Sequence, residues 1–187
     1  IINAGDGTHE HPTQALLDIM SIKEKFGKIK GLNIGIVGDI LHSRVALSNI
    51  FGLTKLGANV KICAPPHLLR RNIEKFGISV TYDIDELIDW SDAINVLRIQ
   101  RERMGIGLIP SIKEYRDLFG ITKDRIKNLN KELVIMHPGP INRGVEIDSY
   151  VADSDQSIIL DQVLNGVAVR MSILYLLLGT SIHEENN

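Results

Sequence analysis

The chain has little cysteine, few aromatic side chains and no strong excess of either charge. Cys63 is the single cysteine among 187 residues, so no internal disulfide can form. This indicates a reducing, cytoplasmic setting. The net charge is -2, without a basic tail, which argues against a nucleic-acid partner. No apolar run approaches the roughly 18 residues of a membrane span. The longest, Met171–Leu178, is much shorter, and no signal peptide is visible, so we expect no membrane partner.

Several well-known site signatures are also missing. The stretch Gly35-Ile36-Val37-Gly38 lacks the third glycine of a dinucleotide-binding fingerprint, and no acidic residue follows Cys63 to hold a ribose. The histidines at 9 and 11 have no third ligand nearby, and neither a phosphate-binding P-loop nor a nucleophile elbow is present. We therefore expect no cofactor and no metal. The chain begins without methionine in a turn-rich stretch, as a piece of a longer protein would.

What the sequence does contain is an alternation of buried strands and amphipathic helices. The apolar runs are four or five residues long and lack strict alternation, as strands covered on both faces do. These runs are 33–37, 59–63, 78–81, 93–97 and 133–136. Helical patterns separate them at 12–26, 43–56, 68–76 and 83–90, and a last one starts near 153–155 and ends at 178. This predicts an α/β fold: a doubly wound, about five-stranded parallel sheet with helices on both faces.

The segment from Gln100 to Lys131 is unusually long for a connection between two strands. It is rich in charge and glycine and has room for two short helices, at 111–119 and 124–129. Connections of this length are commonly functional loops or lids.

Polar side chains gather where three of the predicted strands end. Arg44 follows the first strand, Arg98 and Gln100 follow the fourth, and Pro138-Gly139 follows the fifth. Ligands of open α/β sheets bind at this edge. The planar fork of arginine matches carboxylate oxygens in pairs, and prolines leave backbone carbonyls free to accept hydrogen bonds. The edge thus suits a small molecule that carries carboxylate or phosphate groups, although any one of these side chains alone is more commonly a solvated surface group.

Three motifs, in this order, resemble the carbamoyltransferases, and in particular their aspartate-specific branch. The first is Asn3-Ala4-Gly5-Asp6-Gly7 followed by His11-Pro12-Thr13-Gln14. The second comprises Gly38-Asp39, Arg44-Val45, Ser48 and then Arg98-x-Gln100-x-Glu102-Arg103. The third is the loop that opens His137-Pro138-Gly139-Pro140 and ends at Ile147. The resemblance spans residues 2–179.

The resemblance implies transfer of a carbamoyl group from carbamoyl phosphate to the amino group of L-aspartate, a step of pyrimidine biosynthesis. It uses no cofactor. His11 would donate to the carbamoyl oxygen and Gln14 would hold the carbamoyl amide. Arg44 would bind the α-carboxylate of aspartate, and Arg98, with Gln100, the β-carboxylate. The backbone at Pro138 and Gly139 would accept from the amide or amine.

The family's phosphate loop, Ser-x-Arg-Thr-Arg, is absent from this chain. The resemblance therefore divides the chain into an aspartate-binding domain, roughly 1–152, and a helix, roughly 153–179, that would pack on a carbamoyl-phosphate domain. It also implies a homotrimer of catalytic chains, with regulatory chains as a further option. We expect the 187 residues alone to fold, to self-associate through that helix, and to be inactive.

Two alternatives are open on these residues. An ornithine carbamoyltransferase would show His-Cys-Leu-Pro in place of His137-Pro138-Gly139-Pro140 and would lack the pair Arg98 and Gln100. A stand-alone dicarboxylate-binding module could use the same arginines without catalysis, and the sequence does not separate it from the enzyme.

Overall fold

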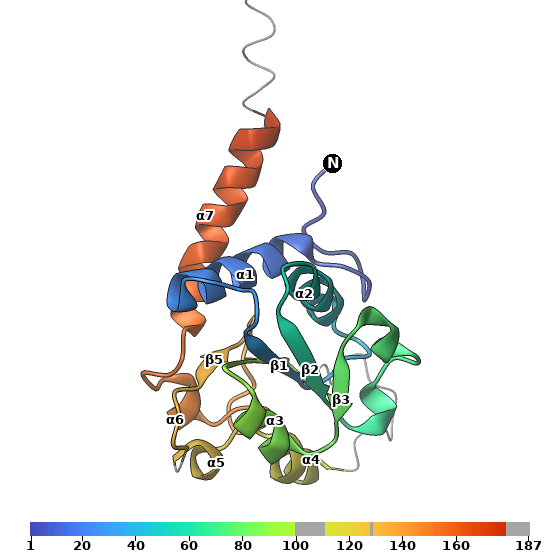
Figure 1. The fold of residues 1–187 in the computed structure, drawn as a ribbon, viewed down its shortest axis with the longest axis vertical. Coiled ribbons are helices and arrows are strands. Elements are labelled where there is room, and N and C mark those ends of the chain that lie inside the picture. Colours follow the sequence, from blue (N-terminus) through green and yellow to red (C-terminus); the bar gives the residue numbers. More distant parts are fainter. Residues whose placement is uncertain (100–110, 128, 179–187) are drawn as a thin grey trace, which may run out of the picture.

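The computed structural model describes residues 1–99, 111–127 and 129–178. Five parallel strands form one sheet in the order β3-β2-β1-β4-β5 (Figure 1). The strands are β1 (Asn33–Val37), β2 (Asn59–Cys63), β3 (Ser79–Thr81), β4 (Ala93–Val96) and β5 (Val134–Met136). Each lies within one residue of its predicted bounds, and the predicted fold class is confirmed.

Helices cover both faces of this sheet. On one face lie α1 (Pro12–Phe26) and α2 (Arg44–Lys55); on the other lie α3 (Ile84–Trp90), α4 (Ile112–Phe119), α5 (Lys123–Lys127) and α6 (Ser149–Ala152) (Figure 1). Side chains alternate between two cores: Ile36 of β1 packs under α1 and α2, whereas the next residue, Val37, packs against α3 and α4. Two covered faces explain why the strands read as continuous apolar runs.

The strand order reverses at β1. The chain leaves β1 for β2 on one side, and only later returns to β4 on the other side. The segments that follow β1 and β4 therefore diverge and open a crevice at the carboxyl edge of the sheet, where ligands of doubly wound folds bind.

Two helix predictions were wrong, for identifiable reasons. The helix expected at 68–76 is two short 3₁₀ turns, η1 (Pro66–Leu68) and η2 (Ile73–Phe76), because Asn72 between them adopts a left-handed conformation with φ of 60°. The last helix, α7, begins at Ile159 rather than near 153–155. The backbone just before it bonds to β5 instead: Ile135 N–H donates to Gln156 O, and Ile158 N–H to Ile135 O.

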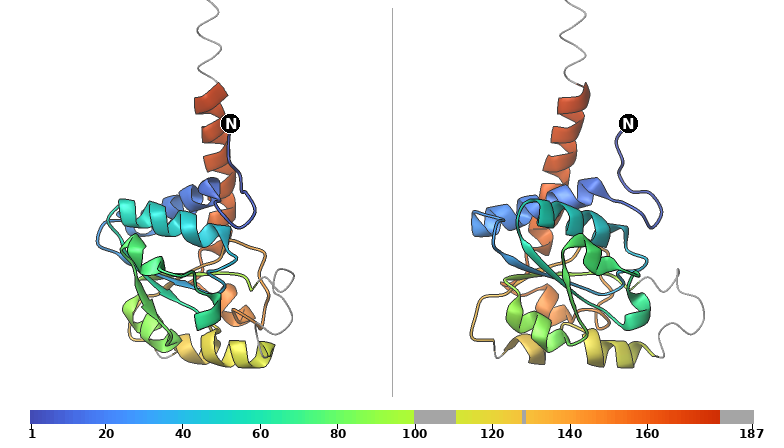
Figure 2. Two further views of the ribbon diagram at one scale, coloured as in Figure 1. Left: turned by 90° about the vertical axis from the view of Figure 1, so that its right-hand side faces the viewer. Right: turned by 45° about the vertical axis from the view of Figure 1, so that its right-hand side comes forward.

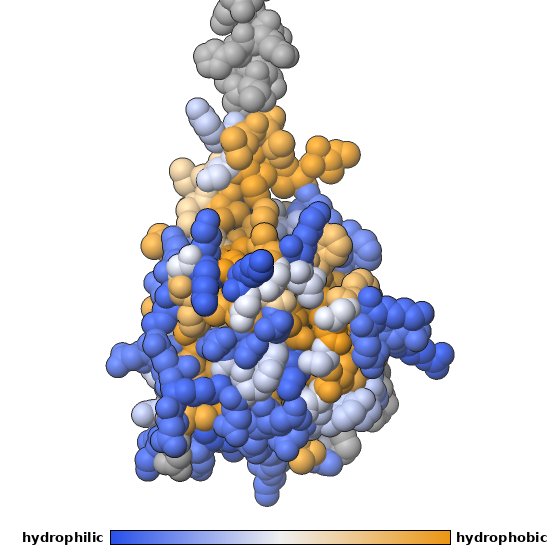
Figure 3. All heavy atoms as spheres, in the orientation of Figure 1, coloured by the Kyte–Doolittle hydropathy of each residue, from blue (hydrophilic) through white to orange (hydrophobic). Residues whose placement is uncertain are grey.

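Helix α7 (Ile159–Leu178) projects well beyond the body of the domain (Figures 1 and 2). Much of the helix surface shown in Figure 3 is apolar, and α7 carries large exposed side chains that include Leu164, Met171 and Tyr175. By length and composition alone α7 could cross a membrane, which corrects the expectation that no segment comes close to a span. Its first turns are tied to α1, however, by buried Gln162 and Asn165.

Candidate active site

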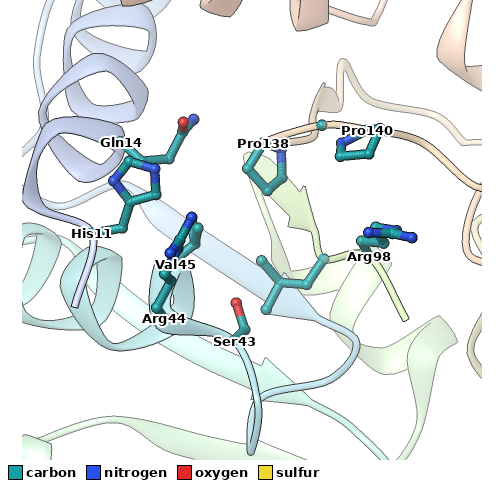
Figure 4. A pocket seen from close by; sticks show the side chains of 10 residues that line it. His11, Gln14, Ser43, Arg44, Val45, Arg98, Pro138 and Pro140 are labelled. Carbon is teal, nitrogen blue, oxygen red and sulfur yellow. The ribbon is translucent and has the colours of Figure 1, made fainter. Parts of the chain in front are cut away.

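A pocket of about 190 Å³ opens in the crevice at the carboxyl ends of β1 and β4 (Figure 4). It is lined by His11, Gln14, Ser43, Arg44, Val45, Leu97, Arg98, Pro138, Gly139 and Pro140. Four separate stretches of chain contribute to it: the start of α1, the start of α2, the end of β4 and the loop after β5. The pocket is small and two arginines line it, which suits a small anion.

Six of the seven residues proposed from the sequence meet in this pocket: His11, Gln14, Arg44, Arg98, Pro138 and Gly139. The seventh, Gln100, lies outside the described residues. The meeting of these six is an outcome of the fold, and their individual roles stay predictions.

His11 sits at the N-cap of α1, directly before Pro12. Its backbone N–H donates to Ser48 Oγ of α2 at 2.9 Å, which sets where the ring enters the pocket. Partial burial, reinforced by the positive charges of Arg44 and Arg170, lowers the pKa of His11 from 6.5 to about 4. The imidazole is therefore neutral at physiological pH and can donate one N–H to a ligand without carrying a charge of its own.

We expect the His11 ring to titrate near pH 4, well below the ordinary imidazole value of 6.5. The unfolded chain binds this proton near pH 6.5, so the contribution of His11 to stability is lost as the pH falls from about 6.5 to about 4. NMR titration of the imidazole carbon-bound protons measures the midpoint. Arg44→Met should move it upward, since a neighbouring positive charge is removed, and a midpoint near 6.5 in the unaltered protein would contradict the assignment.

Arg44 occupies the first turn of α2, after the N-cap Ser43, whose hydroxyl accepts from Ala46 N–H at 3.2 Å. Its guanidinium lies against the backbone of Gly5: a Cβ at Gly5 would be 2.7 Å from Arg44 Cζ. Gly5 also has a φ of 128°, which side chains rarely adopt. Both facts make glycine necessary at position 5 and link the N-terminal segment to the position of Arg44.

Gly5→Ala should displace the Arg44 guanidinium and weaken anion binding about tenfold, because the added methyl group occupies its place. Gly7→Ala is the matched control: φ is also positive, at 49°, but a Cβ there would meet nothing within 4 Å. Binding of succinate to each variant, followed by calorimetry, separates the two. Equal losses in both variants would show that backbone strain alone is responsible.

The loop after β5 is held by buried polar contacts. Gly139 N–H donates to His137 Nδ1 at 2.8 Å, so the ring proton is on Nε2, which faces Glu146 Oε1 at 3.3 Å. Glu146 Oε1 also accepts from Asn142 N–H at 2.6 Å. His137 and Glu146 are fully buried, and their contacts shape the stretch that brings Pro138 to the pocket.

The sequence reasoning missed the polar side chains behind the pocket. Asp18 is buried beneath Gln14, and Gln162 of α7 reaches both Asp18 and the loop after β5. A signal for Asp18 existed, because it is a charged residue on the apolar face of a helix, between Ala15 and Ile22. His42 lies near the same edge of the sheet, partly buried, with Nδ1 3.0 Å from the buried Asp39 carboxylate.

The thiol of Cys63 is a reactive type of group that lies away from the pocket. Cys63 is buried in β2, and burial raises its pKa to about 12, which excludes a nucleophilic role at neutral pH. Among residues 1–99, 111–127 and 129–178, no three histidine, cysteine or acidic side chains gather as they would to bind a metal ion.

The fold is that of a carbamoyltransferase substrate domain. Residues 30–177 match the family described as aspartate/ornithine carbamoyltransferase, Asp/Orn binding domain. The chain belongs to this family.

The curated relatives of this chain are similar to it within the aspartate branch of the family. The chain is 56% identical over 186 residues to the aspartate carbamoyltransferase catalytic subunit of Halothermothrix orenii, covering 100% of this chain and 59% of the relative. It is 61% identical over 179 residues to the protein of the same name from Cytophaga hutchinsonii, covering 96% and 58%. The chain thus spans less than two thirds of the length of these relatives.

Solved structures give the same family. The catalytic subunit of M. jannaschii aspartate transcarbamoylase superposes with a TM-score of 0.78 at 35% identity, over 96% of this chain and 60% of that one. Ornithine carbamoyltransferase from Pyrococcus furiosus superposes with a TM-score of 0.74 at 30% identity, over 92% and 57%.

Proposed function

We propose that this chain forms the aspartate-binding half of an aspartate carbamoyltransferase. In the reaction, the amino nitrogen of L-aspartate attacks the carbonyl carbon of carbamoyl phosphate. The C–O bond to phosphate breaks, and the amine loses a proton. The products are N-carbamoyl-L-aspartate and phosphate. The observation that supports this most strongly is the convergence of Arg44, Arg98, neutral His11 and Gln14 on one pocket.

The pocket favours aspartate over ornithine as the acceptor. Arg44 and Arg98 approach it from different elements, so each can hold one carboxylate of a short dicarboxylate. Ornithine has one carboxylate and a second amine, which would be repelled by the second arginine. All of the curated relatives described above carry the aspartate name, which supports the same choice.

Each remaining group has a defined task in this proposal. An N–H of neutral His11 donates to the carbamoyl oxygen, where negative charge develops as the tetrahedral intermediate forms. Gln14 accepts from the carbamoyl amide, and the backbone carbonyls at Pro138 and Gly139 accept from the amide or the attacking amine. No group forms a covalent bond to substrate, so catalysis consists of positioning and charge stabilisation.

The rest of the active site belongs to a carbamoyl-phosphate domain, which α7 would contact. The large apolar surface of α7 supports this, because free domains rarely expose so much of it. A membrane partner is less consistent, since buried Gln162 and Asn165 hold the start of the helix on α1. The assembly we propose is a homotrimer of full-length chains in the cytoplasm, with regulatory chains optional, serving pyrimidine biosynthesis.

Formation of carbamoyl-aspartate tests the proposal in the full-length chain and in residues 1–187 alone. We expect turnover by the former and none by the latter, with activity restored when the missing domain is supplied. A full-length protein that binds succinate but transfers no carbamoyl group would instead identify a dicarboxylate-binding module.

Self-association of residues 1–187 tests the role of α7. We expect oligomers in sedimentation velocity, and we expect Leu164→Glu with Met171→Glu to shift them to monomers, because the exposed apolar surface is interrupted. A monomeric unaltered chain would contradict the docking role of α7. Leu118→Glu, at another exposed apolar position, on α4, is the control and should leave the oligomers intact.

A further inference from the structure

One carboxylate behind the pocket collects hydrogen bonds from four different elements. Asp18 Oδ1 accepts from Gln14 Nε2 of α1 at 3.0 Å and from Gln162 Nε2 of α7 at 2.7 Å. Asp18 Oδ2 accepts from Asn49 Nδ2 of α2 at 2.6 Å and from Asn95 Nδ2 of β4 at 3.1 Å. The side chain is entirely buried.

This arrangement determines which way the Gln14 amide points. Each of the four neighbouring amides turns its nitrogen towards Asp18, whose oxygens accept all four hydrogen bonds. For Gln14, which also lines the pocket, this leaves Oε1 as the end of the amide available to a ligand. Gln14 therefore presents an acceptor, and a ligand group that fills this position must bring an N–H.

The same carboxylate acts on the opposite wall of the pocket through Gln162. With its nitrogen on Asp18, Gln162 turns Oε1 towards the loop after β5 and accepts from His137 N–H at 2.9 Å. His137 is the residue directly before Pro138, which lines the pocket. Asp18 thus aligns the Gln14 side chain. Through Gln162 it also holds the start of the loop after β5, which lines the pocket.

We propose that Asp18 is a positioning residue that gives the site its selectivity for an acyl donor bearing an N–H. It does so by orienting Gln14 Oε1, and by holding the loop after β5 through Gln162. The proposal deepens the function above and rests on it, because the donor with an N–H is the carbamoyl group. Asp18 itself touches no substrate.

The buried position of Asp18 acts on its carboxyl group in two opposing ways. Burial raises the pKa of its carboxyl, and the four amide hydrogen bonds act in the opposite direction. A buried carboxylate needs all of its partners, because removing them leaves unpaired polar groups in the core. An apolar side chain of similar size at this position would leave the four amides without their acceptor.

The test compares carbamoyl phosphate with acetyl phosphate as donors for the full-length protein. Acetyl phosphate carries a methyl group in place of the amino group, so it cannot donate to Gln14 Oε1. The measured quantity is kcat/KM for carbamoyl phosphate divided by kcat/KM for acetyl phosphate. Asp18→Leu should lower this ratio about tenfold, the equivalent of one hydrogen bond of about 1.4 kcal/mol. An unchanged ratio would overturn the proposal, since a merely structural defect lowers both rates equally.

Two variants separate positioning from packing. Asn49→Ala removes another hydrogen bond of the same carboxylate, but Asn49 does not line the pocket, so the ratio should stay unchanged. Asp18→Asn keeps an oxygen for Gln14 and Gln162, and its amide can face the Asn49 and Asn95 oxygens, which have no partner in the described structure. This variant should retain most of the selectivity, and a loss as large as that in Asp18→Leu would count against the orientation argument.

A measurement on the unaltered protein covers the case in which Asp18→Leu does not fold. The side-chain amide protons of Gln14 should exchange slowly with deuterium in NMR spectra, because they point to a buried carboxylate. Fast exchange would overturn the assignment of the amide orientation. An unaltered full-length protein without carbamoyl transfer, yet with a protected Gln14 amide, would refute the proposed function while leaving the role of Asp18 in orienting Gln14 intact.

Discussion

Arg44→Met in the full-length protein should lower kcat/KM for aspartate about a thousandfold. The guanidinium is proposed to hold one carboxylate through two charge-assisted hydrogen bonds, and each such bond contributes about 1.5–3 kcal/mol. Their joint loss, about 3–6 kcal/mol, corresponds to a factor of about 10² to 10⁴. Most of the loss should fall on the KM for aspartate, because the carboxylate is bound in both the ground state and the transition state.

Steady-state kinetics with aspartate varied at saturating carbamoyl phosphate measures this loss. Arg143→Met is the matched control: Arg143 makes a two-pronged ion pair with Asp153, both bonds being 2.7 Å, but it is exposed and lies outside the pocket. It should change kcat/KM less than threefold. If the Arg44 variant retained its aspartate KM, Arg44 would not be a ligand of the acceptor.

His11→Ala should lower kcat by a factor of about 10² to 10³ with little change in the KM for aspartate. Removal of one donor to a developing oxyanion has this effect in acyl-transfer enzymes, because the bond is strongest in the transition state. The low pKa of His11, about 4, means that the ring is already neutral at pH 7. The pH profile of the unaltered enzyme should consequently show no limb due to His11 between pH 5.5 and pH 8.

Kinetics across that pH range, with His67→Ala as the control, tests the assignment. His67 is exposed in η1 and should be replaceable without effect. A variant at position 11 that lost aspartate affinity but kept kcat would assign His11 to acceptor binding. A limb near pH 6.5 that disappears in His11→Ala would show that the ring must change charge during turnover.

Local chemistry was enough to predict most of the fold. Helix α1 runs from Pro12 to Phe26 as expected, because proline favours the first turn and Gly27, with φ of 73°, ends the helix. The strands were recognisable because both faces of the sheet are covered, which requires apolar residues throughout. One helix prediction failed because partners distant in sequence compete with helix formation, as at Gln156 and Ile158, whose backbones bond to Ile135 of β5. The other failed at Asn72, whose left-handed backbone separates η1 from η2.

The candidate site also contains residues that the sequence predicts and residues that it does not. The residues at strand ends were predictable, since parallel strands bring their carboxyl ends to one edge and a doubly wound order opens a crevice there. The residues behind them were not. Asp18 interacts with Gln162, which is 144 positions away, and no periodic pattern of either helix encodes that contact.

The sequence by itself determined the parallel α/β layers, the family, and six of the side chains that line the pocket. It did so because secondary-structure periodicity and strand-end chemistry are local properties. Only the tertiary structure decided the neutral state of His11, the contact of Arg44 with Gly5 and the orientation of the Gln14 amide. These depend on burial, on neighbouring charges and on hydrogen-bond partners, which exist only once segments far apart in the chain have packed together.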